Sequence, residues 1–228
     1  MTFSIAGLCP RTGEFGCALA TSSMAAGGRA PFVAPGVGVV LSQARSDPRL
    51  GELGVKNLAE GRSAQETLSR MLESTPHAAW RQLAVLDLKG RGAEYTGAKC
   101  TDAKGARIEP GVVVVGNGLA NDKVVGAMLQ GFGEKPASAL SDRLLTALRR
   151  GLEVGGEAYP LRSASLKVAR PGVPFAPIDL RIDCSDTPIE DLQRLWKLWE
   201  PMVDGYIQRC LDPDNSPAAA LIEGHPAR

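Results

Sequence analysis

The chain has 228 residues, of which 26 are Lys or Arg and 25 are Asp or Glu, so its formal net charge is only +1. This balance lacks the basic surface typical of nucleic-acid-binding proteins, and an apolar content of 44% excludes a disordered chain. The length suits one large domain, or at most two small ones, and is ample for a hydrophobic core. The sequence has two histidines, His77 and His225, so a histidine base or a histidine-rich metal site has almost no candidates.

Neither the N-terminal segment nor the cysteine spacing carries a targeting or metal-binding signal. Residues 1–6 lack the basic and apolar runs of a signal peptide, and no stretch reaches the roughly 18 apolar residues of a membrane span. The five cysteines are scattered without a CxxC pair, which argues against a zinc site or a redox motif. We therefore expect a cytoplasmic protein with reduced thiols and no metal or cofactor, which binds neither membranes nor nucleic acid.

The first half of the chain predicts three strands followed by two helices. Turn residues at 10–14 separate two apolar runs, which predicts an N-terminal hairpin, and residues 24–36 are a loop rich in Gly, Ala and Pro. Asp47 with Pro48 predicts one helix start, and the spacing from Ser63 to Glu66 is a capping box. The expected strands are 2–8, 15–21 and 37–43, and the expected helices are 48–60 and 63–73.

The second half predicts three strands, two helices, two strands and a last helix. Leu140, Leu144 and Leu148 recur at helical spacing, which indicates one buried stripe. The last helix carries Trp196 and Trp199 on a broad apolar face. The expected strands are 82–88, 92–96, 112–115, 162–169 and 178–183, and the expected helices are 121–132, 138–153 and 188–210.

Strands therefore come in consecutive groups separated by helix pairs, unlike the strict alternation of a doubly wound parallel sheet. This order predicts an α+β fold, a four-layer αββα sandwich of largely antiparallel sheets covered by helix pairs. The composition shows no internal domain boundary. We expect one domain over residues 1–210, followed by a peripheral or mobile tail over 211–228 that is rich in helix breakers.

Thr2 is the leading catalytic candidate. Removal of an initiator methionine before a small residue would give Thr2 both a hydroxyl and a free α-amine. The amine, with a reference pKa of roughly 7.7–8.0, can take the hydroxyl proton while the oxygen attacks a carbonyl carbon. Such chemistry needs no histidine. If Met1 is retained, the nitrogen of Thr2 is an amide and cannot be the base.

Four further residues have a functional and a plain structural interpretation. Gln43 can hold a substrate or water, or be a polar strand end. Asn117, between two glycines, can donate to an oxyanion, form a turn, or do both. Ser23, after the second predicted strand, can relay a proton or make edge hydrogen bonds. Arg29 can clamp a substrate carboxylate or lie solvated in its loop.

A series of short segments follows a set order along the chain: MTFSIA at 1–6, GCALATSS at 16–23, GVGVVLSQA at 36–44, DP at 47–48, QLAVLD at 82–87, YTG at 95–97, GN at 116–117, GGE at 155–157 and RSA at 162–164. Together these segments resemble a known bacterial family, the domain of unknown function 1028, which is classed as Ntn-hydrolase-like. The order and spacing of the segments carry this resemblance over roughly residues 1–183. It implies an αββα sandwich with an amidohydrolase-like site at the N-terminal strand, without indicating a substrate.

The resemblance also implies substrate-binding residues between Glu157 and Ser163. Family members commonly carry an acidic residue, a basic residue and a Gln-Ser pair where this chain has Glu157 and Arg162-Ser163. Arg162 stands in place of the glutamine, which changes the charge near the expected site. Family members also often have Met where this chain has Gly118.

Three functions remain open from the sequence. The first is an N-terminal-nucleophile amidohydrolase that acts on a small amide or peptide-like substrate through Thr2. The second is a non-catalytic small-ligand-binding protein that retains Met1. The third is an oligomeric scaffold, because the two tryptophans of the 188–210 helix suit either core packing or a homodimer surface. We expect a homodimer, with the helix surface extending its core packing.

Overall fold

The computed structural model describes residues 1–225, which fold as a sandwich of two antiparallel sheets. The larger sheet has the strand order β10-β9-β2-β1-β8-β7, and the smaller has the order β3-β4-β5-β6. The strands are β1 Thr2–Leu8, β2 Phe15–Thr21, β3 Pro31–Ala34, β4 Gly38–Ala44, β5 Arg81–Asp87, β6 Gly92–Thr96, β7 Lys104–Glu109, β8 Val112–Asn117, β9 Ser163–Ala169 and β10 Ile178–Ile182.

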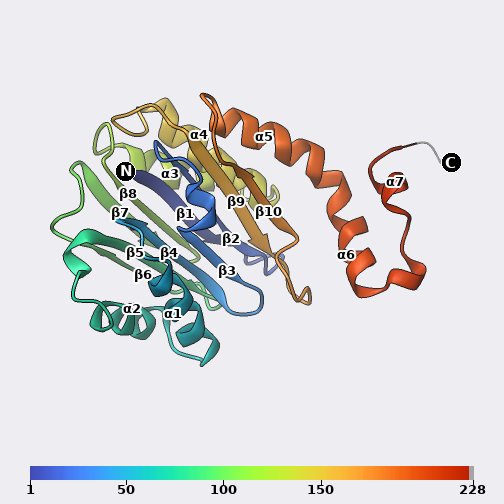
Figure 1. Ribbon diagram of the computed structural model, residues 1–228, viewed down its shortest axis with the longest axis horizontal. Helices are drawn as coiled ribbons and strands as arrows, with labels where there is room; N and C mark the ends of the chain where they lie inside the picture. Colours follow the sequence, from blue (N-terminus) through green and yellow to red (C-terminus); the bar gives the residue numbers. More distant parts are fainter. Residues whose placement is uncertain (226–228) are drawn as a thin grey trace.

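Helices cover the outer face of each sheet (Figure 1). Two pack on the smaller sheet, α1 (Pro48–Ala59) and α2 (Ala64–Glu73). Three pack on the larger sheet, α3 (Val124–Gly133), α4 (Leu140–Glu153) and α5 (Pro188–Trp199). The predicted four-layer αββα sandwich is thus confirmed.

Short helices complete the described chain. They are η1 (Ala26–Gly28), η2 (Ala78–Trp80), η3 (Glu200–Met202), α6 (Val203–Leu211), η4 (Pro213–Asn215) and α7 (Ala219–Ile222). Figure 1 shows α6 and α7 extending away from the sandwich. Within residues 1–225, no helix has the length and apolar character needed to cross a bilayer.

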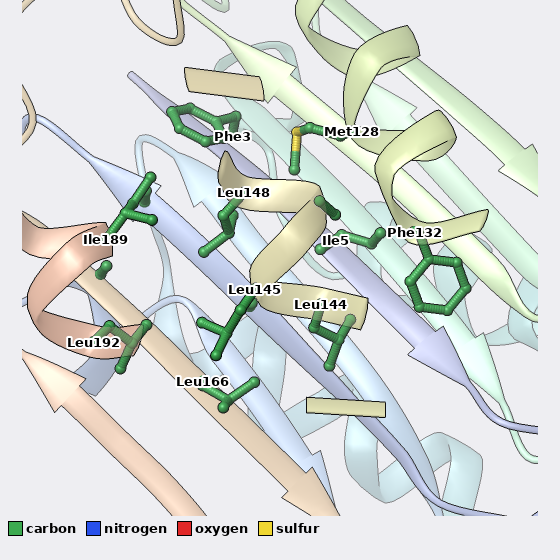
Figure 2. Packing of buried hydrophobic residues seen from close by; sticks show 14 of the residues in the cluster. Phe3, Ile5, Met128, Phe132, Leu144, Leu145, Leu148, Leu166, Ile189 and Leu192 are labelled. Atoms are coloured by element: carbon green, nitrogen blue, oxygen red, sulfur yellow. The ribbon is translucent and has the colours of Figure 1, made fainter. Parts of the chain in front are cut away.

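Three apolar clusters separate the four layers. One lies between the larger sheet and its helices, where Phe3 and Ile5 of β1 meet Leu144 and Leu148 of α4 (Figure 2). A second lies between the sheets, and a third joins the smaller sheet to α1 and α2. Alternate residues of β1 therefore face opposite layers, because side chains of a strand point to its two faces in turn. Phe3 and Ile5 face the helices, whereas Ala6 faces the other sheet.

The predicted helix starts of the first half are confirmed by their caps. The side chain of Asp47 accepts a hydrogen bond from the Arg49 backbone nitrogen at 3.2 Å, and Pro48 opens α1. Ser63 and Glu66 form both bonds of the capping box at the start of α2.

Two strands and one helix interruption were missed from the sequence. Strands β3 and β7 are both edge strands, and their Gly-, Pro- or charge-rich sequences lack a clear apolar alternation. The predicted 188–210 helix is broken at η3, where Pro201 lacks the backbone N–H that a continuous helix needs. Helices α3 and α4 also begin two to three residues later than expected, at Val124 and Leu140.

The two tryptophans of α5 pack inward in this fold. Trp196 is only 2% exposed, and its Nε1 donates to Asp142 Oδ1 at 3.0 Å. The Nε1 of Trp199 donates to the backbone oxygen of Pro177 at 3.1 Å. The core-packing interpretation of these residues is therefore correct, and the homodimer surface stays a prediction.

Two helical glycines offer a matched test of the close approach of α1 to the smaller sheet. A Cβ on Gly51 would overlap the ring of Phe32, whereas a Cβ on Gly126 of α3 would meet no atom within 4 Å. We expect Gly51→Ala to lower the free energy of unfolding by about 1–3 kcal/mol, because it overpacks a closed interface. Gly126→Ala should be neutral or stabilising by up to about 1 kcal/mol. Urea unfolding of both variants checks this, and equal effects would contradict it.

Candidate active site

A row of polar side chains crosses the inner face of the larger sheet at the end where the chain begins. Thr2 of β1 pairs with Asn117 of β8, and Asn117 pairs with Lys104 of β7. On the other side, Phe3 pairs with Ala20, which places Thr2 beside Thr21 of β2. The hydroxyl oxygens of Thr2 and Thr21 are 3.4 Å apart, and both residues are buried.

The smaller sheet presents a matching row of polar residues. Gln43 of β4 pairs with Gln82 of β5, which pairs with Thr96 of β6. Gln43 Nε2 donates to Gln82 Oε1 at 2.8 Å, and Gln82 Nε2 donates to Thr96 Oγ1 at 3.0 Å. Gln43 and Gln82 are at most 1% exposed, so their carboxamides depend on protein partners.

Gln82 joins the two sheets. Its Oε1 accepts a hydrogen bond from Asn117 Nδ2 at 2.9 Å, and its Nε2 donates to the backbone oxygen of Gly116 at 2.9 Å. Gln43 makes a second link, because Ser4 Oγ of β1 donates to Gln43 Oε1 at 2.5 Å. We call Ser4, Gln43, Gln82, Thr96 and Asn117 the amide layer. It fixes the start of β1 against the opposite sheet.

Met1 contacts residues at the ends of both strands that flank Thr2. Its carbonyl oxygen accepts hydrogen bonds from the hydroxyls of Thr2 and Thr21, the latter at 2.6 Å. Its side chain lies against Gly118, which has a φ of +63° and follows Asn117. A Cβ at Gly118 would overlap the Met1 side chain.

Glu157 is a buried carboxyl group beside this end of the sheet. It is 6% exposed and forms an isolated antiparallel bridge with Leu119. Its Oε2 accepts the Ser22 backbone N–H at 2.9 Å, whereas its Oε1 has no hydrogen-bond partner within residues 1–225. Burial raises the pKa of Glu157, while its hydrogen bonds from Ser22 and the positive α-amino group of Met1 act in the opposite direction.

Two further predicted site residues, Ser23 and Ser163, lie next to Thr21 and the loop that follows it. Ser23 is exposed, and its backbone nitrogen donates to Thr21 Oγ1 at 3.1 Å. Ser163, buried at the start of β9, donates from Oγ to the backbone oxygen of Ser23 at 2.7 Å. The structure therefore places both serines in contacts that hold the loop after β2.

The two predicted arginines have protein partners of their own. Arg29 Nη1 donates to the backbone oxygen of Met24 at 2.8 Å, within the same loop. Arg162 forms an ion pair with Asp186 at 3.0 Å, although its backbone nitrogen donates to the oxygen of Thr21. A role in binding a substrate carboxylate stays a prediction for both residues.

Thr21, Gln82, Ser4 and Thr96 were not predicted from the sequence. A usable signal existed for Ser4, a polar residue within an apolar, buried strand, and for Gln82, which directly precedes the apolar run of β5. Thr21 and Thr96 end their strands, so only the strand register shows that they face the site.

Within residues 1–225, no group of three or more His, Cys, Asp or Glu side chains is placed to hold a metal ion. Cys9 and Cys17 lie in the apolar clusters, and burial raises the pKa of Cys17 to about 12. His77 and His225 are exposed.

The amide layer can be tested by removing its central carboxamide. Gln82→Ala leaves the polar groups of Gln43 and Asn117 without their partner inside a buried layer. We expect the free energy of unfolding to fall by about 2–4 kcal/mol, since several buried groups lose hydrogen bonds together. The control is Gln65→Ala, at an exposed position of α2, which should change stability by less than about 0.5 kcal/mol. Equal midpoints in urea unfolding for the two variants would contradict the assigned role of Gln82.

The buried carboxyl of Glu157 predicts a pH-dependent stability in the chain that keeps Met1. Its raised pKa means that the folded protein disfavours the carboxylate, so the wild type loses stability as pH rises through that pKa. Glu157→Gln removes the charge, so we expect its Tm near pH 7 to exceed that of the wild type by about 2–4 °C. The gain should vanish near pH 4, where the wild-type carboxyl is protonated.

Thermal unfolding across this pH range checks the prediction on protein made with a methionine aminopeptidase inhibitor. Glu109→Gln, at an exposed position of β7, is the control and should show no such gain. A wild-type Tm above that of Glu157→Gln at neutral pH would contradict the assignment.

The chain is similar to one protein family and to several solved structures. A family model described as "Family of unknown function (DUF1028)" matches residues 2–192. The crystal structure of protein SPO2555 from Silicibacter pomeroyi, in the same family, has 33% sequence identity and a TM-score of 0.79, over 86% of this chain and 88% of that one. No curated protein matches.

Two Anbu structures align more weakly, each with a TM-score of 0.39. The Anbu (Gly-1) mutant from Hyphomicrobium sp. strain MC1 has 14% identity over 96% of this chain and 100% of that one. Anbu, described as an ancestral beta-subunit, from Yersinia bercovieri has 12% identity over 90% of this chain and 97% of that one. From the family model and the Silicibacter pomeroyi structure, the chain belongs to the DUF1028 family.

Proposed function

We propose that this protein is an N-terminal-nucleophile amidohydrolase that acts on small amides or peptide-like substrates. Removal of Met1 makes Thr2 the first residue and the nucleophile. One observation carries the proposal: the Thr2 hydroxyl is buried beside Thr21, and both hydroxyls already bind a carbonyl oxygen, that of Met1. A carbonyl in this place is what an attacking Thr2 would meet.

The reaction needs only Thr2, its own amine and water. The α-amine accepts the hydroxyl proton as Thr2 Oγ1 bonds to the substrate carbonyl carbon. The carbon–nitrogen bond then breaks, and the departing amine takes that proton. Water hydrolyses the resulting ester, which releases the carboxylic acid and restores the Thr2 hydroxyl.

Neighbouring groups support this role by geometry. Thr21 donates to the Met1 carbonyl oxygen and is oriented by the Ser23 backbone, so it serves as a donor to the developing oxyanion. Asn117 uses one N–H on Gln82, which leaves a second for the substrate. Gln43 Nε2 lies 3.5 Å from the Thr2 backbone oxygen and holds the first residue of β1 in place.

A second function, ligand binding without catalysis, is favoured by one observation. In the chain with Met1, the Met1 carbonyl takes the hydrogen bonds of both threonine hydroxyls, and the Met1 side chain lies against Gly118. If cells keep Met1, Thr2 has no free amine, and the protein is a small-ligand-binding or oligomeric protein. Formation of a homodimer through residues 188–210 belongs to the same open proposal.

Processing and activity test the first function directly. Intact mass of protein from unmodified cells should show the loss of one methionine. The chain starting at Thr2 should hydrolyse members of a p-nitroanilide panel with free and acetylated acyl groups. Thr2→Ala should lose about 10³-fold or more of kcat/KM, while Thr2→Ser keeps a measurable part, because only a hydroxyl nucleophile is required.

The matched control is Thr12→Ala, in the exposed turn after β1, which should keep full activity. A chain with Met1 retained should be inactive. Hydrolysis by Thr2→Ala at the wild-type rate would overturn the proposal.

A further inference from the structure

Met1 occupies the place of an acyl group on the proposed nucleophile, so its contacts describe the substrate. It is an aminoacyl group attached to the nitrogen of Thr2. The nitrogen and Oγ1 of Thr2 stand on adjacent carbon atoms, so an acyl group on either atom occupies nearly the same space. The carbonyl contacts of Met1 with Thr2 and Thr21 agree with that position. This inference rests on the proposed function.

A buried carboxyl group that lacks a partner lies near this stand-in. Glu157 is only 6% exposed, and its Oε1 has no hydrogen-bond partner within residues 1–225. Glu157 forms a β-bridge with Leu119. The residue before Leu119, Gly118, lies against the Met1 side chain. A buried carboxylate needs a charged donor to offset its desolvation, and an α-ammonium group supplies one.

The charges around Glu157 agree with this assignment. Burial raises the pKa of the Glu157 carboxyl, and the positive α-amino group of Met1 acts in the opposite direction. The Ser22 backbone holds the other carboxyl oxygen in place at 2.9 Å. One oxygen therefore fixes the side chain, and the second is left for a ligand.

The side-chain end of the stand-in is apolar and lies against glycine. Because a Cβ at Gly118 would overlap the Met1 side chain, the absence of a side chain there leaves room for an unbranched chain of methionine size. The site thus has three parts: the Thr21 hydroxyl for a carbonyl oxygen, a carboxylate for an ammonium, and a glycine surface for an apolar chain.

We propose that the substrates are aminoacyl amides with a free α-ammonium group, and that Glu157 is the specificity residue that binds this group. Apolar, unbranched acyl side chains of methionine size are favoured. The protein then hydrolyses the amide bond after an N-terminal aminoacyl unit, and does not act after an internal or N-acylated unit.

The test compares L-methionine p-nitroanilide with N-acetyl-L-methionine p-nitroanilide on the chain that begins at Thr2. We expect kcat/KM to be about 100-fold higher for the free amine, in line with a charge-assisted bond. Glu157→Gln should lower kcat/KM for the free amine by about 10- to 100-fold, mainly through KM, and leave the acetylated substrate unchanged. Glu109→Gln should change neither.

Two results would overturn the inference. One is equal or faster hydrolysis of the acetylated substrate. The other is an equal loss on both substrates in Glu157→Gln, which would mean that Glu157 serves the amine of Thr2 itself. If the acetylated substrate is hydrolysed and Thr2→Ala abolishes this, the proposed function stands while the inference falls.

A binding measurement separates the two proposals when no hydrolysis is seen. Calorimetry uses the Thr2→Ala variant from which Met1 has been removed. This variant should bind L-methioninamide and should not bind N-acetyl-L-methioninamide. The chain that keeps Met1 is the control and should bind neither, because Met1 fills the site. Binding without hydrolysis by the wild type supports the ligand class and overturns the proposed function. If neither binding nor hydrolysis is seen, both the ligand class and the proposed function are overturned.

Discussion

The hydrogen bonds of the Gln82 carboxamide hold this end of the sandwich together. Its oxygen accepts from Gln43 and Asn117, and its nitrogen donates to Thr96 and Gly116, so one buried side chain joins four strands. A buried amide is costly unless its donors and acceptor are paired, so these bonds permit a single register between the sheets. Within the larger sheet, the pairing of β1 with β2 places Thr2 beside Thr21.

The same end of the molecule holds two buried oxygens that lack a partner within residues 1–225, Asn117 Oδ1 and Glu157 Oε1. Buried polar atoms in native proteins are nearly always paired, so each one calls for an explanation. The two oxygens lie on segments joined by the Leu119–Glu157 bridge, next to the residue that Met1 contacts. A polar ligand at Thr2 would bring donors to this end of the molecule, in line with the proposed function.

The sequence was sufficient for the fold class because grouped strands, paired helices and caps such as Ser63 with Glu66 are local signals. It missed β3 and β7, whose place at the sheet edges depends on pairing with distant strands rather than on their own composition. Thr2, Gln43 and Asn117 could be named from the chain. Their partners Gln82 and Thr21 could not, because a hydrogen bond across two sheets follows from register and not from spacing.

The central claim, that Thr2 becomes an N-terminal nucleophile, is tested most directly by locating a covalent adduct. The chain that begins at Thr2 is treated with a β-lactone acylating probe, and the modified peptide is sequenced by tandem mass spectrometry. The account predicts an ester on the Thr2 hydroxyl, and none in the chain that keeps Met1. A probe that modifies another residue, or that labels both forms equally, would contradict it.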